Sequence, residues 1–217
     1  MQPQEKVIQC YDATAEKYAA QFIDELSKKH FDSLLLKEFA AANKNNTPFA
    51  DFGCGPGQTT KYLYDHGITD IVGIDISTEM IKTATNLFPK MDFETGDLLN
   101  LTHKPNSFGA AIAFYSIVHF TYRQVKIAFE EIHRVLKPNG EFLFSFHIGD
   151  GILHRDEFLE QPVDVDFYFF ETEKIIELLT KTGYEIIDAL ERHPYEDVEY
   201  PSKRAYIWVG KTSNSKG

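Results

Sequence analysis

Short apolar runs alternate with amphipathic stretches through the middle of the chain. A short apolar run between turn signals predicts a buried strand, whereas apolar positions three or four residues apart predict a helix. By this pattern the strands fall at 48–52, 71–75, 91–95, 110–115 and 141–147, and the helices at 58–66, 77–88 and 122–136. A strand-then-helix repeat with short connections predicts a largely parallel sheet with helices on both faces.

Residues 1–45 have a different, helical pattern. Apolar side chains recur at helical spacing between 28 and 42, and the preceding stretch YDATAEKYAAQFIDEL is also helical in pattern. Both stretches come before the polar break NKNNTP. We therefore expect a helical N-terminal extension at 1–45 and a core at 46–217.

The pattern changes again after residue 147. Residues 148–170 contain a glycine-bearing loop and then the stretch VDVDFYFF, whose alternate apolar positions predict a strand. A helix at 172–182 follows, and then strands at 184–190 and 205–209, joined by a loop that suits an antiparallel hairpin. We expect residues 148–170 to be an insertion in the core fold.

Composition and charge narrow the range of partners. The net charge of −11 opposes the phosphate contacts that dominate nucleic-acid affinity, and no Lys/Arg cluster exceeds two residues. No run approaches the roughly 18 apolar residues of a membrane span, and the start MQPQEKVIQC lacks the pattern of a secretory signal. Two cysteines are too few for a disulfide framework or a four-ligand zinc site, so no metal site is predicted. We expect a cytoplasmic protein with neither nucleic-acid nor membrane partners.

The stretch ADFGCGPGQTT, residues 50–60, places three glycines directly after a predicted strand. A Walker-type phosphate loop counted from Gly53 would need a second glycine at Gln58 and then a lysine, and neither is present. A dinucleotide-binding G-x-G-x-x-G pattern fails in both registers, because its third glycine would fall on Gln58 or on Thr60. The loop therefore argues against a phosphate ligand and gives poor support to NAD.

The remaining pattern is an acid followed by three alternate glycines, at residues 51–57. Asp75 ends the next predicted strand in VGIDIS, and Asp97 lies just past the third in ETGDLL. Together with the helix that ends in EIHRVLKPNGEFLFSF, these motifs resemble the class I S-adenosylmethionine-dependent methyltransferases. Within that class the chain looks like the ubiquinone/menaquinone-biosynthesis enzymes, over residues 11–146. One departure is Gly109, where the family commonly has an acid.

The resemblance implies a fold, a cofactor and a set of contacts. The fold would be α/β and Rossmann-like, a seven-stranded, mostly parallel sheet with an antiparallel last strand and a helical N-terminal lid. Asp75 would accept hydrogen bonds from the cofactor's ribose, Asp97 would accept from the adenine amino group, and the N–H of Leu98 would meet a ring nitrogen. The expected cofactor-binding residues are Tyr11, Tyr18, Asp51, Gly53, Cys54, Gly55, Gly57, Asp75, Ile76, Asp97, Leu98, Tyr115 and Ser116. Which of the two tyrosines touches the cofactor is left open.

Methyl transfer from a sulfonium needs mainly positioning and desolvation, with a base only if the nucleophile arrives protonated. His119, just past the strand at 110–115, is the candidate catalytic residue, as a base or as a ligand for the acceptor. The alternative for His119 is a packing or capping role before the next helix. His147 is a second candidate at the end of the strand at 141–147, and His133 is expected to be structural.

The acceptor pocket is expected from the N-terminal helices, residues 148–170 and the loop at 194–201. These segments carry aromatic residues that suit an apolar or cationic small molecule. The aromatic residues are Phe158, Phe167, Tyr168, Phe169, Phe170, Tyr195 and Tyr200, and the acids are Asp164, Asp166, Glu196, Asp197 and Glu199. The simpler reading of the acids is a solvated surface.

The predicted function is methyl transfer from S-adenosylmethionine to an unidentified small molecule, with S-adenosylhomocysteine as the product. The alternatives are a non-catalytic S-adenosylmethionine-binding protein and an NAD-dependent oxidoreductase. The sequence does not decide between a monomer and a homodimer.

Overall fold

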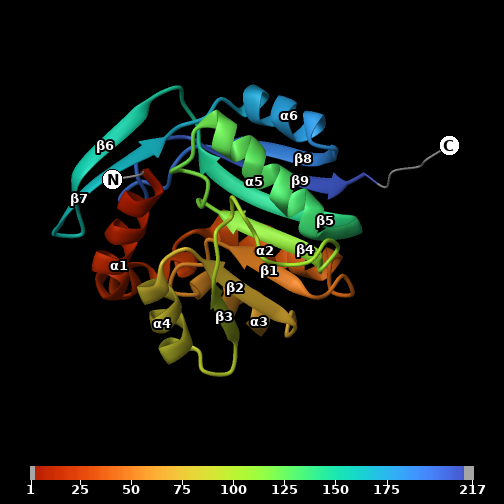
Figure 1. The fold of residues 1–217 in the computed structure, drawn as a ribbon, viewed down its shortest axis with the longest axis horizontal. Coiled ribbons are helices and arrows are strands. Elements are labelled where there is room, and N and C mark those ends of the chain that lie inside the picture. The colour runs from red at the N-terminus through yellow and green to blue at the C-terminus, as the bar shows by residue number, and fades with distance from the viewer. Residues whose placement is uncertain (1–2, 213–217) are drawn as a thin grey trace.

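Seven strands form one sheet in the computed structural model, which describes residues 3–212. The strands are β1 (Phe49–Phe52), β2 (Ile71–Asp75), β3 (Asp92–Thr95), β4 (Phe108–Phe114), β5 (Leu136–His147), β8 (Tyr184–Arg192) and β9 (Arg204–Lys211). Their order is β3-β2-β1-β4-β5-β9-β8 (Figure 1). The first five strands pair in parallel, and β9 is antiparallel to both β5 and β8. The predicted mostly parallel sheet with an antiparallel last strand is confirmed.

Helices cover both faces of this sheet (Figure 1). They are α1 (Pro3–Phe22), η1 (Glu25–Ser27), α2 (His30–Ala42), α3 (Gln58–Asp65), α4 (Thr78–Leu87), α5 (Tyr122–Val135) and α6 (Thr172–Lys181). Alternation along β4 divides its side chains between two cores. Ala111 and Ala113 pack with α5 and α6, whereas Ala110 and Ile112 pack with α2 and α3. A strand buried on both faces explains the continuous apolar run in the sequence.

Side-chain caps fix where the helices beside the sheet edge begin. The Ser77 hydroxyl accepts a hydrogen bond from the Met80 N–H at 3.1 Å and starts α4. Thr121 and Gln124 form a reciprocal capping box that starts α5. Both caps follow directly on a strand and a short loop, so the chain turns into each helix at the carboxyl edge of the sheet.

Residues 148–170 form a hairpin whose first strand the sequence pattern did not reveal. The predicted strand is present as β7 (Gln161–Tyr168), and it pairs with β6 (Ile152–Phe158) in a separate two-stranded sheet. Leu159 and Glu160 at the turn both have positive φ, 50° and 58°. Such turns normally carry Asn-Gly, so this hairpin has no turn signature in its sequence. The charged residues of β6 also hide its alternation.

The connection from α5 to β5 differs from the expected one. The helix predicted at 122–136 ends at Val135, and β5 begins at Leu136 rather than at Glu141. The segment KPNG therefore lies within the long strand. Leu136 pairs with Phe108 before a register shift, and this pairing adds the extra length to β5.

The first helix, α1, is fixed to the hairpin and to α4. Lys6 and Lys17 form ion pairs with Asp164 and Glu160, at 2.6 Å and 2.9 Å. On the opposite side, the Asp12 carboxylate accepts a hydrogen bond from the Ser77 hydroxyl at 2.6 Å. The predicted division into a lid at 1–45 and a core at 46–217 stays a prediction, and residues 1 and 2 lie outside the described part.

The departure from the family pattern at Gly109 has a steric reason. A Cβ at this position would lie 1.9 Å from the backbone oxygen of Asn46, in the turn before β1. Any side chain there must push the turn away from β4.

We expect Gly109→Ala to lower the free energy of unfolding by about 1–3 kcal/mol, the usual cost of overpacking. Chemical denaturation of the purified variant measures this loss. Gly151→Ala is the matched control, because a Cβ there meets nothing within 4 Å. An equal loss in both variants would contradict the steric explanation.

Candidate active site

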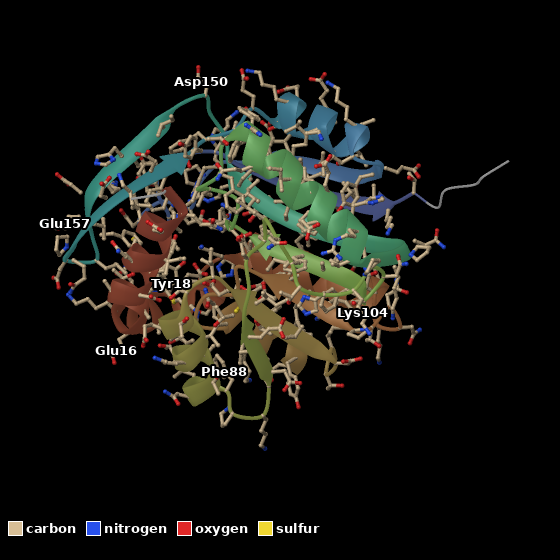
Figure 2. The ribbon with its side chains drawn as sticks, in the orientation of Figure 1. Glu16, Tyr18, Phe88, Lys104, Asp150 and Glu157 are labelled. Atoms are coloured by element: carbon tan, nitrogen blue, oxygen red, sulfur yellow. The ribbon has the colours of Figure 1, made fainter. Side chains whose placement is uncertain are left out.

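A cavity of about 520 Å³ lies at the carboxyl edge of the parallel strands. The strand order reverses between β1 and β4, and ligands of such sheets bind outside this point. Side chains of α1 and of the β6–β7 hairpin also line the cavity, among them Tyr18 and Glu157, which Figure 2 labels. The cavity is therefore bounded by the sheet edge on one side and by α1 and the hairpin on another.

All of the predicted cofactor-binding residues except Gly57 contribute to the cavity wall. They are Tyr11, Tyr18, Asp51, Gly53, Cys54, Gly55, Asp75, Ile76, Asp97, Leu98, Tyr115 and Ser116, and His119 and His147 join them. Gly57 instead precedes α3 with a φ of +86°, and a Cβ there would lie 2.8 Å from the Phe93 ring. Packing against β3 is what requires glycine at this position.

The glycine loop (residues 53–57, between β1 and α3) and the loop after β4 (residues 115–121) approach each other closely. Gly53 has a φ of +72°, and a Cβ on it would lie 2.3 Å from the Cβ of Ser116. The backbone N–H groups of Gly53 and Cys54 both donate to the Ile74 carbonyl, which ties the loop to β2. The Ser116 hydroxyl is buried, and no partner for it is found among residues 3–212.

Asp75 holds the glycine loop and the start of α4 together. Its two carboxylate oxygens accept hydrogen bonds from the Gly55 and Ser77 N–H groups, each at 2.9 Å. Burial raises the pKa of Asp75, and these backbone hydrogen bonds oppose the rise. Because each carboxylate oxygen can accept a second hydrogen bond, Asp75 retains capacity for a ligand.

Asp97 and Leu98 lie beside Asp75 at the next strand end. The Asp97 carboxylate accepts a hydrogen bond from the Leu99 N–H at 2.8 Å, which fixes its rotamer. Leu98 is buried, and both residues line the cavity. Strand ends β2 and β3 thus bring the two predicted acids to one side of the cavity.

Asp51 is buried beneath the glycine loop, with 1% of its surface exposed. The Thr60 hydroxyl donates to its carboxylate at 2.6 Å. Burial, and to a lesser extent the negative charge of Asp75, raises the pKa of Asp51 to about 7. Asp51 is therefore a buried acid that titrates near neutral pH.

Tyr11 and Tyr18 make different contacts. Tyr11 contacts His119, whose Nδ1 lies 2.8 Å from the Asp166 carbonyl oxygen. Because a carbonyl oxygen can only accept, Nδ1 carries the proton of the neutral His119 ring. The Tyr11 hydroxyl then donates to His119 Nε2, at 2.7 Å. Burial lowers the pKa of His119 to about 4. Tyr18 instead lies over the glycine loop, 4.0 Å from where a Cβ on Gly55 would be.

The other two histidines singled out in the sequence lie in different places. His147 lines the cavity, and its Nδ1 is 2.8 Å from the Ser202 hydroxyl. His133 packs edge-on against Tyr184, with ring centroids 5.2 Å apart, and does not line the cavity.

A charged cluster at the β9 side of the cavity was missed by the sequence pattern. Arg192 makes ion pairs with Asp32 at 2.6 Å and with Glu199 at 2.7 Å. Arg204 contacts the same Glu199 at 3.1 Å, and Lys29 pairs with Glu25 at 2.5 Å. The cluster joins η1 and α2 to β8, β9 and the loop between them. The formal charges of the cluster cancel, because three cations meet three acids: Lys29, Arg192 and Arg204 with Glu25, Asp32 and Glu199.

The acids of the variable segments were expected to form a solvated surface. Asp164, Asp166, Glu196 and Asp197 are exposed, as that reading requires. Glu199 is the exception, because its side chain is 1% exposed within the charged cluster. For Glu199 the expectation of a solvated position is wrong.

The sequence of the sheet and its loops matches a known family. Residues 49–140 match the family described as methyltransferase domain. The chain carries a domain of the methyltransferase family. The prediction of a class I S-adenosylmethionine-dependent methyltransferase is confirmed, and the cofactor prediction with it. The narrower likeness to ubiquinone and menaquinone enzymes stays a prediction, and the family match gives no support to NAD.

Individual relatives agree with this family. An uncharacterized methyltransferase of Oceanobacillus iheyensis is 25% identical over 204 residues, which cover 92% of this methyltransferase and 90% of that one. An O-methyltransferase of Pyrenophora dematioidea is 27% identical over 154 residues, 65% of this chain and 55% of that protein. The crystal structure of an S-adenosylmethionine-dependent methyltransferase from Clostridium acetobutylicum has the same fold. Its TM-score is 0.68 at 19% identity, over 94% of this chain and 100% of that chain.

Within residues 3–212, no helix of this methyltransferase is long and apolar enough to span a membrane.

The raised pKa of Asp51 makes the stability of the methyltransferase depend on pH. The pKa is about 7 in the folded chain against an ordinary 3.8, so between these values the folded state binds more protons than the unfolded state. The contribution of Asp51 is therefore fully present below about pH 4 and is lost as the pH rises through about 7.

We expect Asp51→Asn to flatten the fall in the free energy of unfolding between roughly pH 5 and pH 8. Urea unfolding at a series of pH values measures the slope in both proteins. Asp92→Asn, which removes an exposed acid from β3, should leave the slope as in the parent chain. An unchanged slope in Asp51→Asn would show that Asp51 does not titrate in this range.

Proposed function

We propose that this methyltransferase acts on a small molecule that it binds inside the cavity, beneath α1 and the β6–β7 hairpin. The observation that carries the proposal is the cavity of about 520 Å³. Its wall combines the predicted cofactor residues with aromatic side chains of the hairpin and of the β8–β9 loop. A volume of a few hundred Å³ suits a small ligand. The net charge of −11 opposes a nucleic acid as the acceptor.

The cofactor side of the cavity is proposed to run from the glycine loop to the ends of β2 and β3. S-adenosylmethionine supplies an electrophilic methyl group on a sulfonium when it is bound. The spare acceptor capacity of Asp75 suits the two ribose hydroxyls, and the unpartnered Ser116 hydroxyl offers a further polar contact. The place of Tyr18 over Gly55 favours Tyr18, rather than Tyr11, as the tyrosine beside the methionine portion.

The acceptor side is proposed to be the aromatic part of the wall. Phe158, Phe167 and Phe169 come from the hairpin segment, and Tyr200 comes from the β8–β9 loop. These rings suit an apolar or aromatic molecule. When such a molecule is bound, the rings would keep water away from the reacting atoms. The name of the Pyrenophora dematioidea relative, an O-methyltransferase, supports including oxygen nucleophiles among the candidates.

His119 is proposed to act on the acceptor only through Tyr11. Both ring nitrogens of His119 are already engaged, by Tyr11 and by the Asp166 carbonyl. A proton leaving the acceptor would pass to the Tyr11 oxygen while the Tyr11 proton moves to His119 Nε2. The low pKa of His119, about 4, keeps it neutral and able to accept a proton, but makes it a weak base. Such a base suits an acidic nucleophile.

The second candidate function is a protein that binds S-adenosylmethionine without transferring its methyl group. The engagement of both His119 nitrogens within the protein favours this reading, because it leaves no unengaged base at the end of β4.

A location in the cytoplasm, expected from the sequence, stays a prediction.

A panel of hydroxylated, amino and thiol metabolites tests the proposal directly. We expect at least one apolar or aromatic member to release S-adenosylhomocysteine at a rate well above the enzyme with cofactor alone. Coupled detection of S-adenosylhomocysteine measures the release. Tight cofactor binding without release across the panel would favour the binding protein instead.

We expect Asp75→Asn to weaken S-adenosylhomocysteine binding by about tenfold to a hundredfold, because hydrogen bonds to a charged group contribute roughly 1.5–3 kcal/mol. Calorimetric titration measures the affinity, and a thermal melt checks that the variant is folded. Asp70→Asn, an exposed acid just before β2, is the matched control. Equal affinities in the two variants would remove Asp75 from the cofactor site.

A further inference from the structure

His147, at the end of β5, differs from His119 in having a ring nitrogen without a partner. The Ser202 hydroxyl lies 2.8 Å from His147 Nδ1, and no other partner for this hydroxyl is found within residues 3–212. We assign the hydroxyl as the donor to Nδ1, which places the proton of the neutral ring on Nε2. Over the same residues Nε2 makes no hydrogen bond. In this tautomer His147, which lines the cavity, has an N–H donor without a partner among the described residues.

Three aromatic rings surround this donor. The ring centroid of His147 lies 5.1 Å from that of Tyr115, 5.8 Å from that of Phe169 and 6.1 Å from that of Tyr200. These rings come from the loop after β4, the end of the hairpin segment and the β8–β9 loop. All four residues line the cavity. A flat aromatic ligand could contact several of these faces at once.

The charge around His147 is set by Lys29, Arg204 and Glu199. The Lys29 ammonium and the Arg204 guanidinium lie 5.2 Å and 6.0 Å from the centroid of the Tyr115 ring. Burial is the main cause that lowers the pKa of His147, to about 3. Arg204 and Lys29 lower it further, and Glu199 opposes them with a smaller effect. At His147 the effect of the two cations therefore exceeds that of Glu199, although the cluster as a whole is balanced in charge.

We propose that His147 donates a hydrogen bond to an ionised hydroxyl oxygen of the acceptor, a phenolate or an enolate, whose ring lies among Tyr115, Phe169 and Tyr200. This inference rests on the proposed function, because it concerns the acceptor side of the same cavity. Positive charge nearby stabilises an oxyanion and disfavours an ammonium group. An acceptor that arrives ionised needs no strong base, which agrees with the engaged nitrogens of His119.

A chromogenic phenol can test the proposal without knowledge of the natural acceptor. Para-nitrophenol and two larger nitrophenols change absorbance when they ionise, so their pKa can be read while they are bound. The protein is first saturated with S-adenosylhomocysteine, and calorimetry confirms that the product binds. We expect at least one probe to bind and its pKa to fall by about one unit, the size of shift that a nearby opposite charge produces.

Two variants at His147 separate the donor from the ring. His147→Phe keeps an aromatic ring and removes the N–H, so we expect probe affinity to fall about tenfold and the pKa to move back toward that of the free phenol, with the part due to Lys29 and Arg204 retained. His147→Gln, which retains an N–H donor, should keep part of the shift. The control is His66→Gln, an exposed histidine at the end of α3. Ser202→Ala leaves His147 in place and provides a second test, in which we expect a smaller shift.

Several results would overturn the proposal. It fails if the protein binds S-adenosylhomocysteine but none of the phenols, if a bound phenol keeps its free pKa, or if His147→Phe and Ser202→Ala both leave the shift unchanged. Para-nitrobenzoate binding more tightly than para-nitrophenol would show that the site selects a carboxylate and not an ionised hydroxyl. Absence of S-adenosylhomocysteine binding would instead overturn the proposed function and this inference with it.

Discussion

The close approach of the Gly53 backbone to the Ser116 side chain is the constraint on which the site depends. These residues follow β1 and β4, the neighbouring strands between which the strand order reverses. Their approach is so close that a Cβ on Gly53 would lie 2.3 Å from the Cβ of Ser116. In the loop after β4, Tyr115 adopts a left-handed backbone conformation, and its φ of 56° is uncommon for a tyrosine. The turn places the Tyr115 ring beside His147, with ring centroids 5.1 Å apart, while the glycine loop contacts Asp75.

Helix α1 links the two sides of the cavity through separate polar contacts. Asp12 accepts a hydrogen bond from Ser77, next to Asp75 on the cofactor side. Tyr11 donates to His119, which in turn donates to the Asp166 carbonyl on the hairpin. Movement of this helix would therefore disturb the start of α4 and the hairpin together. In the proposed division of the cavity, access to the cofactor side and access to the acceptor side depend on this same helix.

The parts of the structure that the sequence predicted are those with local signals. The parallel core followed from strand and helix periodicity, and the acids at the ends of β2 and β3 followed from family motifs. The β6–β7 hairpin was only half predicted, because its turn uses Leu159 and Glu160 where glycine and asparagine are usual. The charged cluster gave no signal, since Asp32 and Arg192 are far apart in the chain and meet only in the folded sheet. Packing against Phe93 accounts for a glycine at position 57, and its assignment to the cofactor site stays a prediction.

The reversed direction of β9 has a consequence for how such a protein can diversify. Since β9 is antiparallel, the loop between β8 and β9 returns to the same edge of the sheet as the loops after the parallel strands. This loop and the hairpin both come from the second half of the chain, whereas the glycine loop and the strand ends of β2 and β3 come from the first. Insertions or substitutions in the second half could therefore change the molecule that is methylated while the donor site is inherited intact.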